Sequence, residues 1–331
     1  MKVASALPWT EPLWNRLSQQ KQSGRLGHAL LVVGQEGIGK RLLLREFAQK
    51  LLCSDSKIQP CGECPSCHLY AAGSHPDLLM VEPEETGKQI KIEQIRKVTD
   101  FVNTTPQKGG GKVILLGPSE AMNNNASNAL LKSLEEPSGQ VTLLLYSHQP
   151  SGLLATIKSR CQQYEMYPPT WVQGLEWLNE NCQESSVESV LRLAKGAPLR
   201  ALNMIEQDIH VQYMQFCQGM LDLSGGGSHW NELMVKWKSW DTSSVLQWFY
   251  ELILDVQKLK SGIAEQSLSV PELSALTTKL SKNCDYGQLE SMLEKAIFAQ
   301  KALKGQANPN PQMLIETLLI DWISLLGQAR A

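Results

Sequence analysis

Short strand-like runs alternate with stretches of helical periodicity through the first half of the chain. The strand-like runs are Ala29–Val33, Asp77–Val81, Lys112–Leu116, Val141–Tyr146 and Gln162–Met166. Helical spacing lies between them, at Lys40–Leu52, Ile92–Asn103 and Asn123–Glu135. This alternation predicts an α/β fold in which helices cover both faces of a parallel sheet.

The pattern changes after Pro168-Pro169, where strand-like runs give way to helical spacing. We expect a domain over 1–168, a small helical domain over 169–208 and an all-α domain over 209–331. A glycine-rich stretch, Ser224–Ser228, predicts a loop within the last domain, and apolar spacing over Met313–Leu326 predicts its final helix.

Composition narrows the class of protein. The 331 residues carry a formal net charge of -2, whereas proteins that bind nucleic acid strongly by themselves usually show a basic excess. The first residues lack the apolar run of a signal peptide, and no stretch reaches the roughly 18 apolar residues of a membrane helix. We therefore expect a cytoplasmic protein with no membrane partner.

A phosphate-binding loop is predicted where the first strand meets the first long helix. The segment Gly34-Gln35-Glu36-Gly37-Ile38-Gly39-Lys40 lies between these two elements. Glycines allow backbone N–H groups to wrap around phosphate oxygens, and the N-terminus of the helix favours negative charge. The residues that would bind phosphate are Gly34, Gly37, Gly39 and Lys40.

Two features needed for ATP hydrolysis are missing. The position after Lys40 should be Ser or Thr, whose hydroxyl binds Mg²⁺, but it is Arg41, which has no acceptor atom. The strand Lys112–Leu116 should end in an acidic residue, but Gly117-Pro118 follows it. Glu120 lies further on and is more simply a carboxylate at a helix start. We expect no hydrolysis by this chain, and whether the loop still binds nucleotide stays open.

Four of the eight cysteines lie within fifteen residues, which indicates a metal site: Cys53, Cys61, Cys64 and Cys67. Four thiolates suit a closed, structural Zn²⁺ site. An iron–sulfur cluster is the alternative, although the expected Cys-Pro is absent. His68 and His75 are substitute ligands that four cysteines would make unnecessary. The other four cysteines are scattered and are expected in the core.

Two further segments resemble the sliding-clamp loaders of bacteria, which belong to the AAA+ family. They are Asn123–Pro137, which ends in Leu-Glu-Glu-Pro, and the motif Ser159-Arg160-Cys161. The resemblance implies a RecA-like AAA+ domain with a zinc module near 53–67, a small helical lid and a helical collar that joins subunits into a ring.

The resemblance also implies a function. The chain would be a non-hydrolysing subunit of the DNA polymerase III clamp loader, in a hetero-pentameric ring with gamma/tau and delta subunits. Through the complex it would help to load the beta sliding clamp onto primed DNA. Arg160 would act in trans as an arginine finger on the ATP of a neighbouring motor subunit. In the motor subunits, a second arginine in the lid senses phosphate. Leu199 occupies that position in this chain and Arg200 follows it, so the resemblance does not assign phosphate sensing to Arg200.

Two other functions compete with this interpretation. One is an active, gamma/tau-like ATPase of the same loader, which Arg41, Gly117 and Pro118 disfavour. The other is a zinc-dependent nucleic-acid-binding module, which the net charge and the small size of the cysteine segment disfavour.

Overall fold

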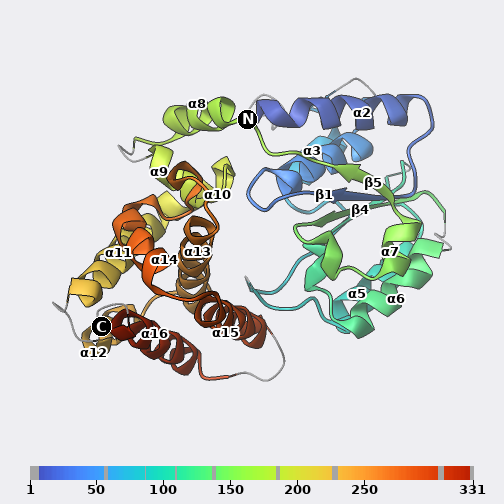
Figure 1. Ribbon diagram of the computed structural model, residues 1–331. Helices are drawn as coiled ribbons and strands as arrows, with labels where there is room; N and C mark the ends of the chain where they lie inside the picture. Colours follow the sequence, from blue (N-terminus) through green and yellow to red (C-terminus); the bar gives the residue numbers. More distant parts are fainter. Residues whose placement is uncertain are drawn as a thin grey trace. The chain divides into compact units, whose positions relative to one another are not determined.

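A computed structural model describes residues 7–55, 59–85, 87–108, 110–135, 139–183, 187–225, 230–304 and 309–328. The chain divides into two compact units, Met1–Leu202 and Asn203–Ala331 (Figure 1). Each unit has its own buried core.

The first unit is built on a five-stranded parallel sheet with the order β2-β3-β4-β1-β5. Its strands are β1 (Ala29–Val33), β2 (Leu78–Val81), β3 (Lys112–Leu116), β4 (Val141–Ser147) and β5 (Gln162–Glu165). The predicted parallel sheet is thus confirmed, with small shifts at strand ends. Asp77 directly precedes β2, and its carboxylate accepts hydrogen bonds from the backbone of Gln107 and Lys108, both at 2.8 Å.

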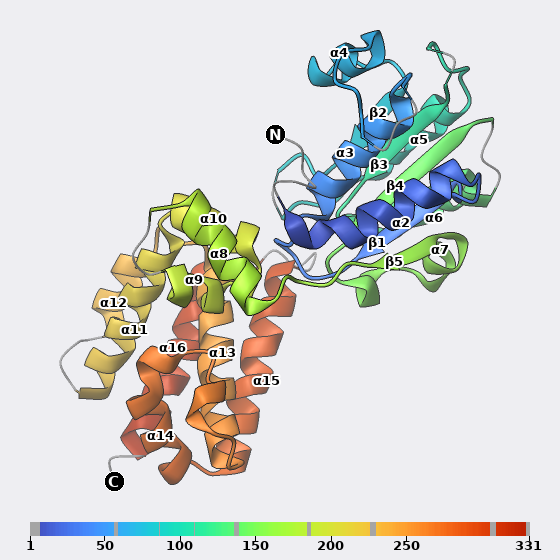
Figure 2. The same ribbon diagram turned by 90° about the horizontal axis from the view of Figure 1, so that it is seen from above.

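Helices cover both faces of this sheet (Figure 2). On one face lie α2 (Glu11–Gln22) and α3 (Lys40–Leu52), and on the other lie α5 (Ile92–Val102), α6 (Asn124–Glu135) and α7 (Ala155–Arg160). Alternate strand residues feed the two cores, as the two-residue period of a strand requires. The α3 side buries Leu30, Val32, Val113, Leu115 and Leu144, and the α6 side buries Leu31, Ile114, Leu116, Leu143 and Leu145.

The remaining elements of this unit are short. They are α4 (Pro65–Ala71) and the 3₁₀ turns η1 (Pro8–Thr10), η2 (Ser119–Ala121) and η3 (Pro150–Gly152). Three helices follow the sheet, α8 (Trp171–Asn181), α9 (Val187–Leu193) and α10 (Pro198–Glu206), and α10 runs across the boundary between the units. Thr170 caps α8 by accepting a hydrogen bond from the backbone N–H of Gln173.

The second unit is helical throughout the part that the structure describes. It contains α11 (Ile209–Gly225), α12 (Trp230–Trp237), α13 (Thr242–Lys260), α14 (Ser274–Asn283), α15 (Tyr286–Lys304) and α16 (Pro311–Gln328), with short turns η4 (Glu265–Ser267) and η5 (Pro271–Leu273). Helix α13 packs against α14, α15 and α16. The all-α expectation is confirmed for these residues, while Gly226–Ser228 of the predicted loop lie outside them.

Tryptophans contribute to the core of the second unit. Trp237 and Trp248 are buried, and the ring of Phe216 contacts both of them.

No helix among the described residues is both long and apolar enough to span a membrane.

Candidate functional site

The predicted phosphate loop joins β1 to α3. Its three glycines have positive φ angles of 156°, 79° and 102° at Gly34, Gly37 and Gly39, a backbone that side chains rarely permit. A Cβ on Gly34 would lie 2.3 Å from the carbonyl oxygen of Met166. The glycines therefore allow both the sharp turn and the close approach of neighbouring backbone.

Lys40 is bonded to its own loop. Its Nζ donates hydrogen bonds to the carbonyl oxygens of Gly34 and Gln35, both at 2.5 Å, and the residue is only 2% exposed. Burial lowers the pKa of Lys40 to about 8, against the opposing effect of the nearby Glu120 and Glu36 carboxylates. In this arrangement the ammonium group closes the loop on itself.

The helices after the sheet also bind the loop. The Leu199 backbone N–H, in the first turn of α10, donates to the Gly37 carbonyl at 3.0 Å. A Cβ on Gly37 would lie 2.4 Å from the Cβ of Arg200, so the start of α10 fills the space beside this glycine. Gln35 Nε2 donates to the Lys195 carbonyl at 2.9 Å. The loop thus contacts both the start of α10 and the turn that precedes it.

Trp9 fixes the other side of the loop. Its indole N–H donates to the Ile38 carbonyl at 2.7 Å, and its ring meets the edge of Trp177 on α8, with centroids 5.8 Å apart. The loop carbonyls of Gly34, Gln35, Gly37 and Ile38 therefore all accept hydrogen bonds from the protein itself.

Arg41 forms a two-pronged ion pair with Glu82, just beyond β2. Its Nε and Nη2 both donate to the carboxylate, and the Tyr146 hydroxyl donates to the same carboxylate at 3.2 Å. Hydrogen bonding to Glu82 raises the pKa of Arg41. Sequence reasoning missed Glu82 because only the folded sheet brings the end of β2 to the start of α3.

The end of β3 holds no metal-binding acid. A Cβ on Gly117 would lie 2.7 Å from the Tyr146 ring and 2.8 Å from its backbone oxygen, so the tight packing excludes a larger side chain. Glu120 lies in η2, as expected of a carboxylate at a helix start, and its Oε1 accepts hydrogen bonds from the backbone of His148 and Gln149. The residue after Lys40 thus offers no hydroxyl to Mg²⁺, and its guanidinium is paired with Glu82 instead.

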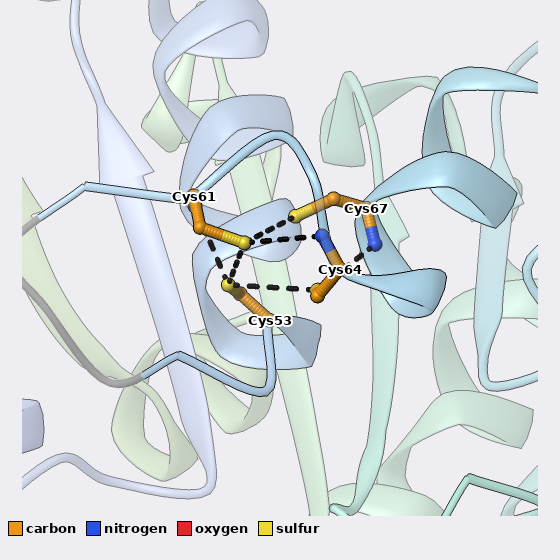
Figure 3. A group of neighbouring side chains, drawn as sticks. All are labelled: Cys53, Cys61, Cys64 and Cys67. Atoms are coloured by element: carbon orange, nitrogen blue, oxygen red, sulfur yellow. Dashed lines mark hydrogen bonds between the residues drawn. The ribbon is translucent and has the colours of Figure 1, made fainter.

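The four clustered cysteines converge at the end of α3 (Figure 3). Their sulfur atoms all lie within 4.8 Å of one another, with neighbouring pairs at 3.5, 3.9 and 4.0 Å. Four ligands at the usual Zn–S distance of about 2.3 Å in a tetrahedron would have sulfurs about 3.8 Å apart. The donor set fits one tetrahedral metal ion and leaves little room for an iron–sulfur cluster.

Backbone amides donate hydrogen bonds to three of these sulfur atoms. The amides of Cys61, Cys64 and Cys67 each donate to the sulfur of the preceding cysteine of the group, at 3.3–3.4 Å. Hydrogen bonds from the Cys67 and Ser54 amides lower the pKa of Cys64 to about 6, whereas burial raises that of Cys67 to about 12. Amide donors of this kind stabilise thiolates around a metal.

His75 supports the cysteine module without being a ligand. Its Nδ1 accepts a hydrogen bond from the Asp77 backbone N–H, so the opposite Nε2 bears the proton and donates to the Ser66 hydroxyl at 2.6 Å. The Ser66 hydroxyl in turn donates to the Leu52 carbonyl at 2.7 Å. His75 therefore links α4 and α3 to the residue that precedes β2. His68 is exposed and lies outside the metal-binding group.

The motif Ser159-Arg160-Cys161 separates into an exposed and a buried part. The Arg160 side chain is 34% exposed, and it contacts Glu135 and the Thr156 carbonyl. Cys161 belongs to the core under α6 and α7, and burial raises the pKa of its thiol to about 12.

Of the other scattered cysteines, Cys217 and Cys284 are buried as expected, but Cys182 is only half-buried.

Sequence comparison relates the chain to replication proteins. A family model described as "DNA polymerase III, delta subunit" matches residues 9–170, and one for its C-terminal part matches residues 187–324. The chain is 38% identical over 329 residues to the DNA polymerase III subunit delta' of Pseudomonas aeruginosa, covering 98% of this chain and 99% of the relative. It is 30% identical over 317 residues to the Escherichia coli subunit of that name, covering 95% and 94%.

A solved structure of a DNA polymerase III gamma subunit-related protein from Thermotoga maritima is also similar. It is 18% identical, with 94% of this chain and 99% of that one covered and a TM-score of 0.46.

Proposed function

Because this chain belongs to the DNA polymerase III subunit delta' family, we propose that it is a clamp-loader subunit that assists ATP hydrolysis without hydrolysing ATP itself. Its partners are gamma/tau and delta subunits in a five-membered ring, and through the ring it acts on the beta clamp and primed DNA. This function makes the chain a fixed component of the loader in the cytoplasm.

The phosphate loop supports the non-hydrolysing half of this proposal. A motor subunit needs a hydroxyl for Mg²⁺ after the loop lysine and an acid at the end of β3. Here Arg41 is engaged by Glu82, and Gly117 packs against Tyr146. The ammonium group of Lys40 donates hydrogen bonds to carbonyl oxygens of the loop. The loop is better suited to carry α10 than to bind a triphosphate.

Arg160 supports the assisting half of the proposal. It ends α7 at the surface of the first unit, where a neighbouring subunit can approach it. A guanidinium beside the γ-phosphate neutralises charge that develops in the transition state, and such fingers contribute on the order of 10³–10⁵ in rate. The burial of Cys161 beside it fixes the backbone from which Arg160 extends.

The remaining parts of the chain receive structural roles. Cys53, Cys61, Cys64 and Cys67 hold one Zn²⁺, which stabilises the segment between α3 and β2. The helical domain of 209–331 acts as the collar that joins the subunits, the segment 169–208 is the lid, and residues 1–168 form the RecA-like domain. Arg200 anchors the lid to Gly37, and this packing supports a structural role over phosphate sensing.

The observation that carries the proposal is the pairing of Arg41 with Glu82 where an ATPase binds Mg²⁺. The test is reconstitution of the loader from gamma/tau, delta and this chain, with ATP turnover measured in the presence of clamp and primed DNA. We expect background turnover from the isolated chain, impaired turnover without it and full turnover when it is added. Turnover by the isolated chain that Lys40→Ala abolishes would contradict the proposal.

A further inference from the structure

Glu135 and Arg160 are the last residues of two neighbouring helices, α6 and α7. The carboxylate of Glu135 forms an ion pair with Nη2 of Arg160. On the other side of the guanidinium, Nη1 donates to the Thr156 carbonyl at 3.0 Å. The side chain of Arg160 is therefore held at two points, one on each helix.

The helix that bears Glu135 is itself firmly anchored. Leu130 and Leu134 of α6 are almost completely buried against the sheet. The carbonyl of Leu134 is hydrogen-bonded to Nε2 of His28, just before β1, at 2.9 Å. Glu135 thus extends from a backbone that is fixed to the residue before β1.

The guanidinium keeps capacity for a further acceptor. An arginine offers five N–H donors, and the two contacts described here use one on each Nη. The side chain of Arg160 remains 34% exposed, and that of Glu135 is 49% exposed. The two contacts fix the direction of the Arg160 guanidinium and leave its other N–H groups available to a further acceptor.

We propose that Glu135 is a positioning residue that holds Arg160 in the orientation required by the ATP site of the neighbouring subunit. This inference rests on the proposed function, in which Arg160 acts in trans. A free arginine side chain has many rotamers, and their loss on reaching a transition state slows the reaction. An ion pair made before the partner arrives removes much of that cost, because a planar guanidinium held at two points is already oriented.

The test uses the reconstituted loader with Glu135→Ala and Glu135→Gln. We expect Glu135→Ala to lower kcat for ATP about twofold, a smaller loss than in Arg160→Ala, with KM for ATP and assembly of the ring unchanged, because misplacing a catalytic group acts on the transition state. Glu135→Gln keeps an acceptor oxygen and should fall between this variant and the wild type. Glu84→Ala, which removes a similarly exposed carboxylate paired with Lys91, is the matched control and should leave kcat unchanged.

A double variant separates positioning from a general structural role. If Glu135 acts through Arg160, adding Glu135→Ala to Arg160→Ala should cause no further loss of kcat. An additive loss of kcat in the double variant would overturn the inference, and so would an unchanged kcat in Glu135→Ala. A raised kcat in Glu135→Ala would also overturn it, because Glu135 would then hold Arg160 away from the ATP site. Normal turnover in Arg160→Ala alone would overturn the proposed finger itself, and this inference with it.

Discussion

Arg41 donates two hydrogen bonds to the carboxylate of Glu82, which ties the first turn of α3 to the end of β2. P-loop ATPases that hydrolyse ATP have a hydroxyl that binds Mg²⁺ at the position of Arg41. At this position the chain has a fixed positive charge paired with a carboxylate. The loop keeps the fold of a phosphate-binding element while its polar groups bind other parts of the protein.

Replacing Arg41 with Thr should not create an ATPase. The hydroxyl would return, but no acid follows β3, and Gly117 has no space for one. Because the ion pair is partly exposed, the free energy of unfolding should fall by only about 0.5–1 kcal/mol. Turnover by the purified Arg41→Thr chain would contradict this account, and Arg41→Lys, which keeps the charge without the two-pronged geometry, is the control for stability.

Gly37→Ala should loosen α10 from the loop. The new Cβ would lie 2.4 Å from that of Arg200, in addition to the strain at a φ of 79°. Gly73→Ala is the matched control, because Gly73 has a φ of 68° but no atom within 4 Å of a Cβ. We expect faster amide hydrogen exchange over residues 197–206 in Gly37→Ala alone. Equal exchange in the two variants would show that the packing of Arg200 on Gly37 does not hold α10.

The stability contributed by Lys40 should depend on pH. Burial lowers its pKa in the folded state to about 8 from an ordinary value of 10.5, so above pH 8 the unfolded chain binds more protons. The free energy of unfolding of the wild type, relative to Lys40→Met, should therefore rise by up to about 3 kcal/mol between pH 8 and 10.5. A difference that stays constant over this range would exclude a buried amine at this position.

Zinc should be present in the purified chain and should depend on the clustered cysteines. Cys61→Ser removes one ligand and should lower zinc content and the protease resistance of residues 59–77, because structural zinc stabilises the fold around it. Cys182→Ser, outside the cluster, should change neither property. Iron and sulfide in place of zinc would indicate the iron–sulfur alternative.

The sheet and the metal cluster could be predicted from the sequence because both depend on local spacing. All five strands lie where the alternation of strand-like and helical runs predicts them, and α3 has the predicted bounds. Differences arise at caps. The side chain of Asn123 accepts a hydrogen bond from the Ala126 backbone N–H, so this residue precedes α6 and does not belong to it.

The contacts that the loop forms with other parts of the protein could not be predicted in the same way. Trp9 bonds to Ile38, Glu82 to Arg41 and Leu199 to Gly37, and each pair joins elements far apart in the sequence. Their residue types are ordinary for their elements, so only the folded chain brings them together. The ion pair of Glu135 with Arg160 could not be predicted for the same reason, although each residue lies in a motif that the sequence contains.

ATP turnover by a loader that contains Arg160→Ala tests the central claim most directly. The matched control is Lys158→Ala, which removes another cation of α7 and leaves Glu135 and the Thr156 carbonyl in place. The account predicts a ring that assembles normally but whose clamp- and DNA-stimulated turnover falls severalfold, because the one ATP site that this chain completes loses about 10³ or more in rate. Turnover equal to that of Lys158→Ala and the wild type would contradict it.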